Sequence, residues 1–246
     1  MNAFITGGSR GIGRALVLKF VREGCGCAFT YAVREDAAAE TIRLAREIRP
    51  DVKIESYRLD LRDLATIEAV VEQAIQDFEN IHVLVNNAGM VHDGPVAFMS
   101  DDDWNEVLSA NLTGPFYLIR SFVMHFLSNK MGRIVNIGSL SAGGSTGQAN
   151  YAAAKAGLIG LSNTVAREYA RKGITSNVVT VGYVPTELTD QHFAKELEKV
   201  WMSYCPMRRA GTPEEIAGMV YYLTTPEAAF INGENVRVSG GLTYAP

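Results

Sequence analysis

The chain has 246 residues, enough to bury the core of one large α/β domain. Hydrophobic residues make up 47% and charged residues 20% of it, which is ordinary for a soluble globular protein. The formal net charge of −4 gives no reason to expect nucleic-acid binding. No apolar run is long enough to cross a bilayer, and the N-terminus lacks the basic region of a signal peptide. We therefore expect a cytoplasmic protein with neither nucleic-acid nor membrane partners.

Short β-rich runs alternate with longer helical stretches along almost the whole chain. Strands are expected over residues 3–6, 27–31, 53–57, 82–86, 133–138, 175–181 and 235–238. Helices are expected near 13–23, 37–49, 64–78, 103–129, 150–172 and 213–223. This alternation predicts a mostly parallel, seven-stranded, doubly wound (Rossmann-type) sheet with helices on both faces. No linker or repeat divides the chain, so we expect a single domain over 1–246.

One segment breaks the alternation. Between the sixth strand and the last helix lie Phe193, Trp201, Met202 and Tyr204. Because segments at the carboxyl ends of strands bind ligands in such sheets, we expect a substrate lid at about 183–212. A packed connection between strand and helix is the alternative.

Three cysteines and four histidines are too scattered to suggest a metal site. Cys25 and Cys27 share one face of a predicted strand, and we interpret them as reduced core thiols.

A glycine-rich turn follows the first predicted strand, with the spacing Gly7-x-x-x-Gly11-x-Gly13. Such a turn lets backbone N–H groups approach a phosphate at the start of a helix. Its place at the first strand-to-helix junction favours a nucleotide site over a merely tight turn.

Tyr151 and Lys155 are four residues apart on an Ala-rich predicted helix, so they share one face. An ammonium close to a phenol favours the phenolate, and we therefore expect Lys155 to lower the Tyr151 pKa. Alone, this spacing is weak evidence, because a half-buried Tyr beside a solvated Lys is common.

Three further polar signals lie near predicted strand ends. They are Asn86-Asn87-Ala88-Gly89 after the fourth strand, Asn111 within the following helix, and Ser139 after the fifth strand. An Asn in mid-helix is locally unfavourable and suggests a polar role, whereas Ser139 could simply cap a turn.

Together these motifs, in this order and approximate spacing, resemble the classical short-chain dehydrogenase/reductases over nearly the whole chain. The resemblance implies that Tyr151 exchanges a proton with the substrate carbonyl oxygen and that Ser139 hydrogen-bonds the same oxygen. It implies that Lys155 tunes the phenol and binds the nicotinamide ribose, and that Asn111 holds a water linked to Lys155. With our reading of the second strand, the expected cofactor contacts are Gly7, Ser9, Arg10, Gly11, Ile12, Gly13, Arg34, Asp60, Leu61, Asn87, Ala88, Gly89, Tyr151, Lys155, Gly182, Val184 and Thr186. A helix N-cap is the alternative for Asp60.

The second strand ends without the carboxylate that would select NAD. Arg10 and Arg34 could instead bracket a 2′-phosphate, although both could be solvated surface residues. We therefore favour NADPH without excluding NADH.

Within the family, the runs 147–160, 166–175 and 231–241, together with Glu187, look most like 3-oxoacyl-[acyl-carrier-protein] reductases. That likeness implies NADPH-dependent reduction of a 3-oxoacyl thioester on acyl carrier protein, and a homotetramer that pairs helices 103–129 and 150–172. Lys130, Arg133 and Lys172 are candidate carrier-docking residues beside the cleft. Val181 replaces a common proline, and the 139–151 segment is about a residue short, which leaves room for a polyketide or polyene pathway. The alternatives are a dehydrogenase of a free small alcohol, sugar or ketone, and a non-catalytic nucleotide-binding protein.

Overall fold

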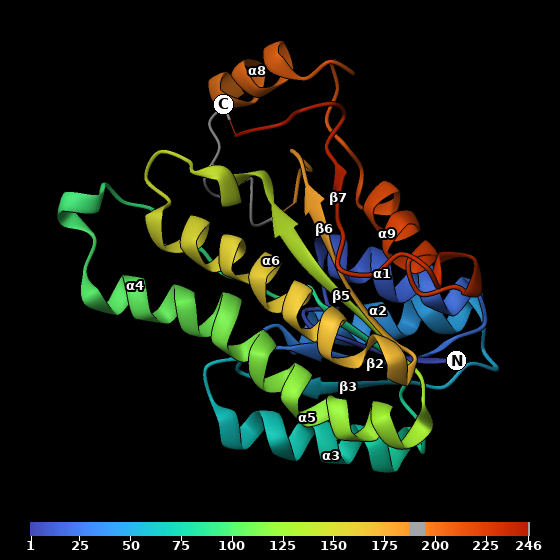
Figure 1. Cartoon of the computed structure of the whole chain (residues 1–246). Helices are drawn as coiled ribbons and strands as arrows, with labels where there is room; N and C mark the ends of the chain where they lie inside the picture. Colours follow the sequence, from blue (N-terminus) through green and yellow to red (C-terminus); the bar gives the residue numbers. More distant parts are fainter. Residues whose placement is uncertain (187–194, 246) are drawn as a thin grey trace.

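The structure is a computed structural model that describes residues 1–186 and 195–245. Its seven strands form one all-parallel sheet in the order β3-β2-β1-β4-β5-β6-β7 (Figure 1). The strands are β1 (Asn2–Ile5), β2 (Gly26–Tyr31), β3 (Ile54–Arg58), β4 (Val83–Asn86), β5 (Gly132–Ser139), β6 (Ile174–Val181) and β7 (Asn235–Val238). This confirms the predicted doubly wound sheet.

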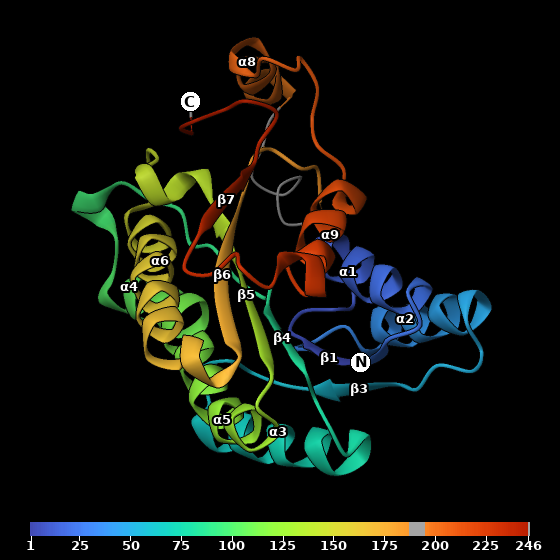
Figure 2. The same cartoon turned by 45° about the vertical axis from the view of Figure 1, so that its right-hand side comes forward.

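Helices cover both faces of the sheet (Figures 1 and 2). One face carries α1 (Gly11–Arg22), α2 (Glu35–Ile48) and α9 (Pro213–Tyr222); the other carries α3 (Leu64–Phe78), α4 (Asp101–Leu108), α5 (Gly114–Asn129) and α6 (Ala149–Tyr169). Helix α8 (Lys195–Tyr204) lies beyond the carboxyl ends of β5 and β6. Short 3₁₀ turns are η1 (Val96–Phe98), η3 (Leu140–Gly143), η4 (Ala170–Lys172) and η5 (Pro226–Ala228).

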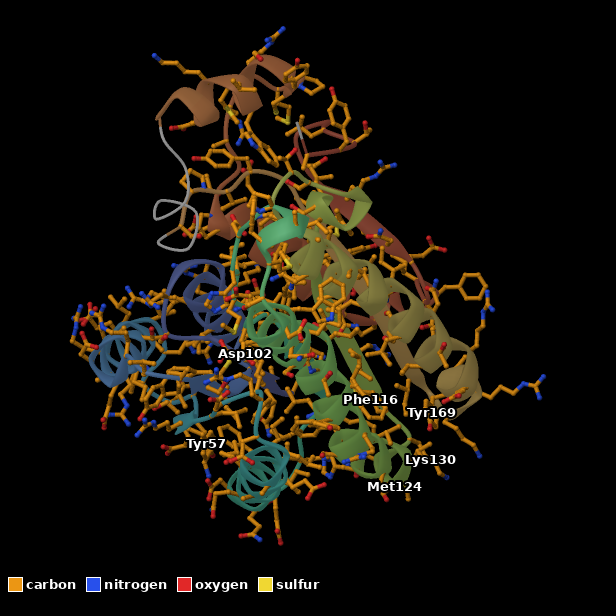
Figure 3. The ribbon with its side chains drawn as sticks, turned by 90° about the vertical axis from the view of Figure 1, so that its left-hand side faces the viewer. Tyr57, Asp102, Phe116, Met124, Lys130 and Tyr169 are labelled. Carbon is orange, nitrogen blue, oxygen red and sulfur yellow. The ribbon has the colours of Figure 1, made fainter. Side chains whose placement is uncertain are left out.

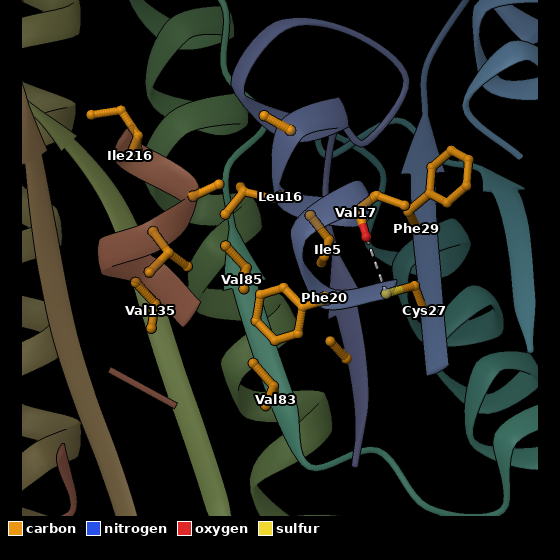
Figure 4. Close-up of a cluster of buried hydrophobic side chains, with 14 of the residues drawn as sticks. Ile5, Leu16, Val17, Phe20, Cys27, Phe29, Val83, Val85, Val135 and Ile216 are labelled. Carbon is orange, nitrogen blue, oxygen red and sulfur yellow. Dashed lines mark hydrogen bonds between the residues drawn. The ribbon is translucent and has the colours of Figure 1, made fainter. Parts of the chain in front are cut away.

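The core follows the alternation of side chains along the strands. Val83, Val85 and Val135 face α1 and α9, in a cluster with Phe20 (Figure 4). Leu84 and Ile134, one position along, pack into the second cluster beneath α3 and α5. Buried on both faces, the central strands read as continuous apolar runs. Cys25 and Cys27 are buried free thiols, as expected.

The long helix predicted over 103–129 is wrong in one respect. Helix α4 ends at Leu108, a π-helical turn η2 (Ser109–Thr113) follows, and α5 begins at Gly114. Pro115 has no N–H to donate to the Asn111 carbonyl four residues earlier, so the regular ladder cannot continue there. The Asn111 side chain donates instead to the Val107 carbonyl and to the loop after β4. The break thus places the Asn111 side chain beside the loop after β4.

Among the described residues, no helix is both long and apolar enough to span a membrane.

Candidate active site

The glycine-rich turn connects β1 to α1 and leaves no room for side chains. Gly7 and Gly11 have φ of +68° and +51°, and a Cβ on Gly13 would lie 1.9 Å from the Gly7 carbonyl oxygen. The first turn of α1 has neither a side-chain cap nor an acidic residue. Ile12 packs on the core from the same turn. The cradle therefore fits the phosphates of a dinucleotide.

Hydrogen bonds join this turn to the loop after β4. The Thr6 hydroxyl oxygen accepts from the backbone N–H groups of Asn87 and Ala88, both at 3.0 Å. The Asn87 amide in return donates to the carbonyls of Thr6 and Gly7, at 2.9 and 3.3 Å. The structure thus brings Gly7, Asn87 and Ala88 together, as the sequence predicted. It also reveals Thr6 as the residue that joins the two loops.

The first turn of α2 is fixed to the same glycine turn by Arg14, which the sequence analysis missed. One guanidinium nitrogen of Arg14 donates to the Ser9 carbonyl at 2.8 Å and to the Ala37 carbonyl at 3.2 Å. The buried Thr41 hydroxyl donates to the Ser9 carbonyl at 3.1 Å. Because Arg14 lies in the middle of an amphipathic helix, no local sequence signal marked it. Its effect is to hold the first turn of α2 beside Ser9.

Ser139, Tyr151 and Lys155 converge at the carboxyl end of β5. Ser139 is the last residue of β5, and Tyr151 and Lys155 lie one turn apart on α6. A hydrogen bond joins the side chains of Ser139 and Tyr151. The Lys155 Nζ lies 5.5 Å from the centroid of the Tyr151 ring and donates to the Ile137 carbonyl at 2.9 Å. Two hydroxyls and an ammonium therefore share one small site.

The expected lowering of the Tyr151 pKa is not found in this structure. Burial raises the pKa of Tyr151 to about 12, and the hydrogen bond from Ser139 opposes that rise only in part. Burial also lowers the pKa of Lys155 to about 8. The physical reason is that both charged forms lose water, while the ammonium is directed to a backbone carbonyl and not to the phenol oxygen. The four-residue spacing predicted proximity correctly but omitted desolvation.

Asn111 is buried beside the loop that follows β4. Its Oδ1 accepts from the Met90 N–H at 3.1 Å, and its Nδ2 donates to the Met90 carbonyl at 2.8 Å. A Cβ on Gly89 would lie 2.4 Å from this Oδ1 and 3.7 Å from the Lys155 Nζ. Asn111, Gly89 and Lys155 thus meet at one point. The Asn111 oxygen retains a second lone pair toward that space.

Asn150 is a second residue that the sequence analysis missed. It is fully buried, and its Nδ2 donates to the carbonyls of His92 and Asp103, at 3.0 and 3.1 Å. These bonds hold the first turn of α6 against the loop after β4 and against α4. Its position directly before Tyr151 was the available signal.

Asp60 and Leu61 follow β3 at the adenine side of the predicted cofactor site. The Asp60 carboxylate pairs with the Arg62 guanidinium at 2.7 Å, and Leu61 is buried. The helix N-cap alternative for Asp60 is wrong, because Asp63 caps α3 by accepting from the N–H groups of Ala65 and Thr66.

Gly182, Val184 and Thr186 form the segment leaving β6. A Cβ on Gly11 would lie 3.2 Å from the Thr186 methyl group, so this segment crosses directly over the glycine turn. Val184 is buried, and Gly182 packs closely against Ser239. Glu187 and the remainder of 187–194, including Phe193, lie outside the described residues.

The described part of the expected lid packs near the carboxyl end of β5. Trp201 of α8 is buried against Tyr183, with ring centroids 5.9 Å apart, and both cluster with Leu140. Leu140 directly follows Ser139. A cavity of about 110 Å³ remains under α8, lined in part by Met202, Cys205, Met207 and Val238.

Lys130, Arg133 and Lys172 lie at the wrong end of the sheet for docking beside this cleft. Lys130 and Lys172 lie two residues before the first residues of β5 and β6, whereas Ser139 ends β5, about 20 Å further along the strand. Figure 3 shows Lys130 far from α8. Arg133 donates to the carbonyls of Gly132 and Gly173, both at 2.9 Å, and packs into the structure. The placement beside the cleft is therefore wrong within one chain, because turns at opposite ends of parallel strands cannot share a rim.

Comparisons with known proteins agree with this geometry. A family model described as "Enoyl-(Acyl carrier protein) reductase" matches residues 7–243. The chain is 36% identical to the 3-oxoacyl-[acyl-carrier-protein] reductase FabG of Vibrio harveyi and 38% identical to that of Salmonella typhimurium strain LT2; both alignments cover 98% of this chain and 96% of the relative. Among solved structures, levodione reductase superposes with a TM-score of 0.93 at 28% identity, covering 98% of this chain and 96% of that one.

Proposed function

Because the chain belongs to the short-chain dehydrogenase/reductase family and is an NAD(P)H-dependent oxidoreductase, we propose that it reduces a 3-oxoacyl thioester on acyl carrier protein. The product is the 3-hydroxyacyl thioester, in fatty-acid or polyketide and polyene biosynthesis. The full-length similarity to two carrier-protein reductases supports this substrate class. The single observation that carries the proposal is the meeting of Ser139, Tyr151 and Lys155 beside the glycine cradle.

The two hydroxyls define where a carbonyl oxygen binds. Since the Ser139 and Tyr151 side chains are hydrogen-bonded to each other, one acceptor oxygen can replace that bond and receive both donors. When bound, a reduced nicotinamide would supply the hydride that the carbonyl carbon accepts. Tyr151 delivers the proton to the oxygen, and its raised pKa keeps the phenol protonated for that step.

Lys155 stabilises the phenolate that remains after the proton transfer. Its Nζ lies 5.5 Å from the centroid of the Tyr151 ring and donates a hydrogen bond to the Ile137 carbonyl oxygen. Asn111 fixes the loop at Gly89 and offers a lone pair for a water beside Lys155. That water would return the proton to the site.

NADPH is the proposed cofactor, held by the glycine turn and by the loop after β4. Arg10 is the N-cap of α1 and Arg34 is the N-cap of α2, and Arg14 of α1 donates to a carbonyl in the first turn of α2. A 2′-phosphate between them would meet two guanidinium groups.

The segment 183–212 is proposed as the substrate lid. Trp201 joins α8 to Tyr183 and Leu140, so the position of α8 is linked to the strand end that carries Ser139.

The substrate class is tested by NADPH oxidation with one 3-oxoacyl group presented on acyl carrier protein and on a short thiol. We expect a clear preference in kcat/KM for the carrier-bound form. Equal rates, or turnover of free ketones alone, would move the proposal to the family members that act on small alcohols, sugars or ketones. A Tyr151→Phe sample supplies the background rate of NADPH oxidation with each substrate.

We also propose a homotetramer that pairs the α4–α5 and α6 helices. Phe116 and Met124 lie two turns apart on α5 and are 42% and 67% exposed (Figure 3). Exposed apolar side chains aligned on one helix are typical of an interface between subunits. Light scattering is expected to give four times the chain mass, and a Met124→Lys variant is expected to give smaller species.

A further inference from the structure

Arg34, the N-cap of α2 in the turn after β2, is already bound by a carboxylate. Arg34 Nε donates to one oxygen of Asp36 at 2.8 Å, and Nη2 donates to the other at 2.6 Å. This two-point geometry is the one a guanidinium uses for a phosphate. Both side chains are more than half exposed, at 51% and 67%. A competing anion can therefore reach the pair from solvent.

The pair lies where a dinucleotide presents its adenosine ribose. Gly8 N–H donates to the Thr30 carbonyl of β2 at 2.9 Å. Arg14 spans the Ser9 and Ala37 carbonyls, and Ala37 directly follows Asp36. The end of β2 beside the glycine turn is where this fold selects between a 2′-hydroxyl and a 2′-phosphate.

Resting on the proposed cofactor site, we propose that Asp36 is a residue that sets cofactor specificity, by competing with the 2′-phosphate for the Arg34 guanidinium. A phosphate that binds here must displace the Asp36 carboxylate from Arg34. The negative charge of that carboxylate then repels the phosphate. NADH carries no 2′-phosphate and meets no such competition. Asp36 therefore weakens the preference for NADPH that Arg10 and Arg34 create.

The chain contains a matched control at the other end of α2. Arg49 and Asp51 form the same two-point pair, with Nε to Oδ1 at 3.0 Å and Nη2 to Oδ2 at 2.9 Å. Both partners are exposed, and Arg49 is the C-cap of α2. Asp51→Asn removes the same charge three residues beyond the end of α2, without touching the cofactor corner.

The test is calorimetric titration of the full-length protein with adenosine 2′,5′-bisphosphate and with 5′-AMP. Asp36→Asn is expected to tighten the bisphosphate about fivefold, the effect of releasing one exposed ion pair, and to leave 5′-AMP unchanged. Asp51→Asn is expected to match the wild type for both. Adding Arg34→Ala to Asp36→Asn is expected to cancel the gain.

An Asp36→Asn protein that binds the bisphosphate no better than Asp51→Asn does would overturn the inference. So would a gain that persists after Arg34→Ala. Because neither nucleotide is reduced and no acyl substrate is present, this result is independent of the carrier-protein assay. A failed thioester assay with an intact Asp36 effect would overturn only the proposed substrate.

Discussion

The Lys155 Nζ lies 5.5 Å from the centroid of the Tyr151 ring, yet its hydrogen bond goes to the Ile137 carbonyl oxygen at 2.9 Å. The ammonium is thereby anchored to the sheet and not to the phenol. Its field still reaches the ring, while burial keeps the phenol protonated. The arrangement suits a proton donor whose conjugate base is stabilised only after the proton has left.

Tyr151→Phe is expected to lower kcat by about 100- to 10,000-fold, the usual contribution of a positioned acid or base. Tyr169→Phe is the matched control, because Tyr169 is the last residue of the same helix and contacts the core beneath α3 and α5. Steady-state kinetics of both variants check the prediction. Comparable activity in the two variants would remove Tyr151 from the proposed chemistry.

The rate of reduction is expected to decrease above about pH 8, where Lys155 loses its proton. Below that pH the ammonium is present and stabilises the developing phenolate; above it the amine is neutral and cannot. A profile of kcat/KM from pH 6 to 10 measures this alkaline limb. Lys155→Arg, which stays charged over the whole range, is expected to lose the limb if it retains activity. A wild-type profile that stays flat to pH 10 would contradict the assignment.

Gly89→Ala is expected to destabilise the fold by about 1–3 kcal/mol, because its Cβ would lie 2.4 Å from the Asn111 oxygen. Gly218→Ala in α9 is the control. Its Cβ meets no described atom within 4 Å, and alanine in a helix interior is expected to add about 0.5–1 kcal/mol. Urea unfolding separates the two. Equal urea midpoints in the two variants would show that the loop after β4 accommodates the added Cβ without loss of stability.

Two histidines at the amino ends of the strands are expected to make the protein acid-sensitive. His82 Nδ1 accepts from the Asn2 N–H and His125 Nε2 accepts from the Ile81 N–H, both at 3.1 Å, so both rings must be neutral. Burial lowers the pKa of each. A base whose pKa is lower in the folded state takes up its proton more readily when unfolded, so stability is present above about pH 6.5 and is lost below it.

The free energy of unfolding should therefore decrease between pH 7 and pH 5, by at most about 1.4 kcal/mol per pH unit for each proton taken up. Urea titrations at several pH values measure the slope. His125→Gln preserves an acceptor for the Ile81 N–H without titrating, and it should flatten the slope. If the slope of the unfolding free energy against pH is unchanged in that variant, the acid sensitivity does not come from His125.

The amino-acid sequence alone determined the sheet and the position of the reacting groups along the chain. Apolar runs of strand length between amphipathic stretches leave a doubly wound sheet as the simplest way to bury them, and every predicted strand lies within one residue of its observed bounds. The same alternation placed Ser139 after the fifth strand and Tyr151 on the following helix, and the family resemblance assigned them to one site.

Only the tertiary structure decided what surrounds those groups. Desolvation reversed the expected shift of the Tyr151 pKa, because burial depends on neighbours far along the chain. The bidentate ion pair between Arg34 and Asp36 depends on the conformation of the turn between β2 and α2, which residue spacing does not specify. Lys130 and Lys172 were misplaced for a related reason. Strand direction determines which end of the sheet a turn occupies, and charge alone carries no such information.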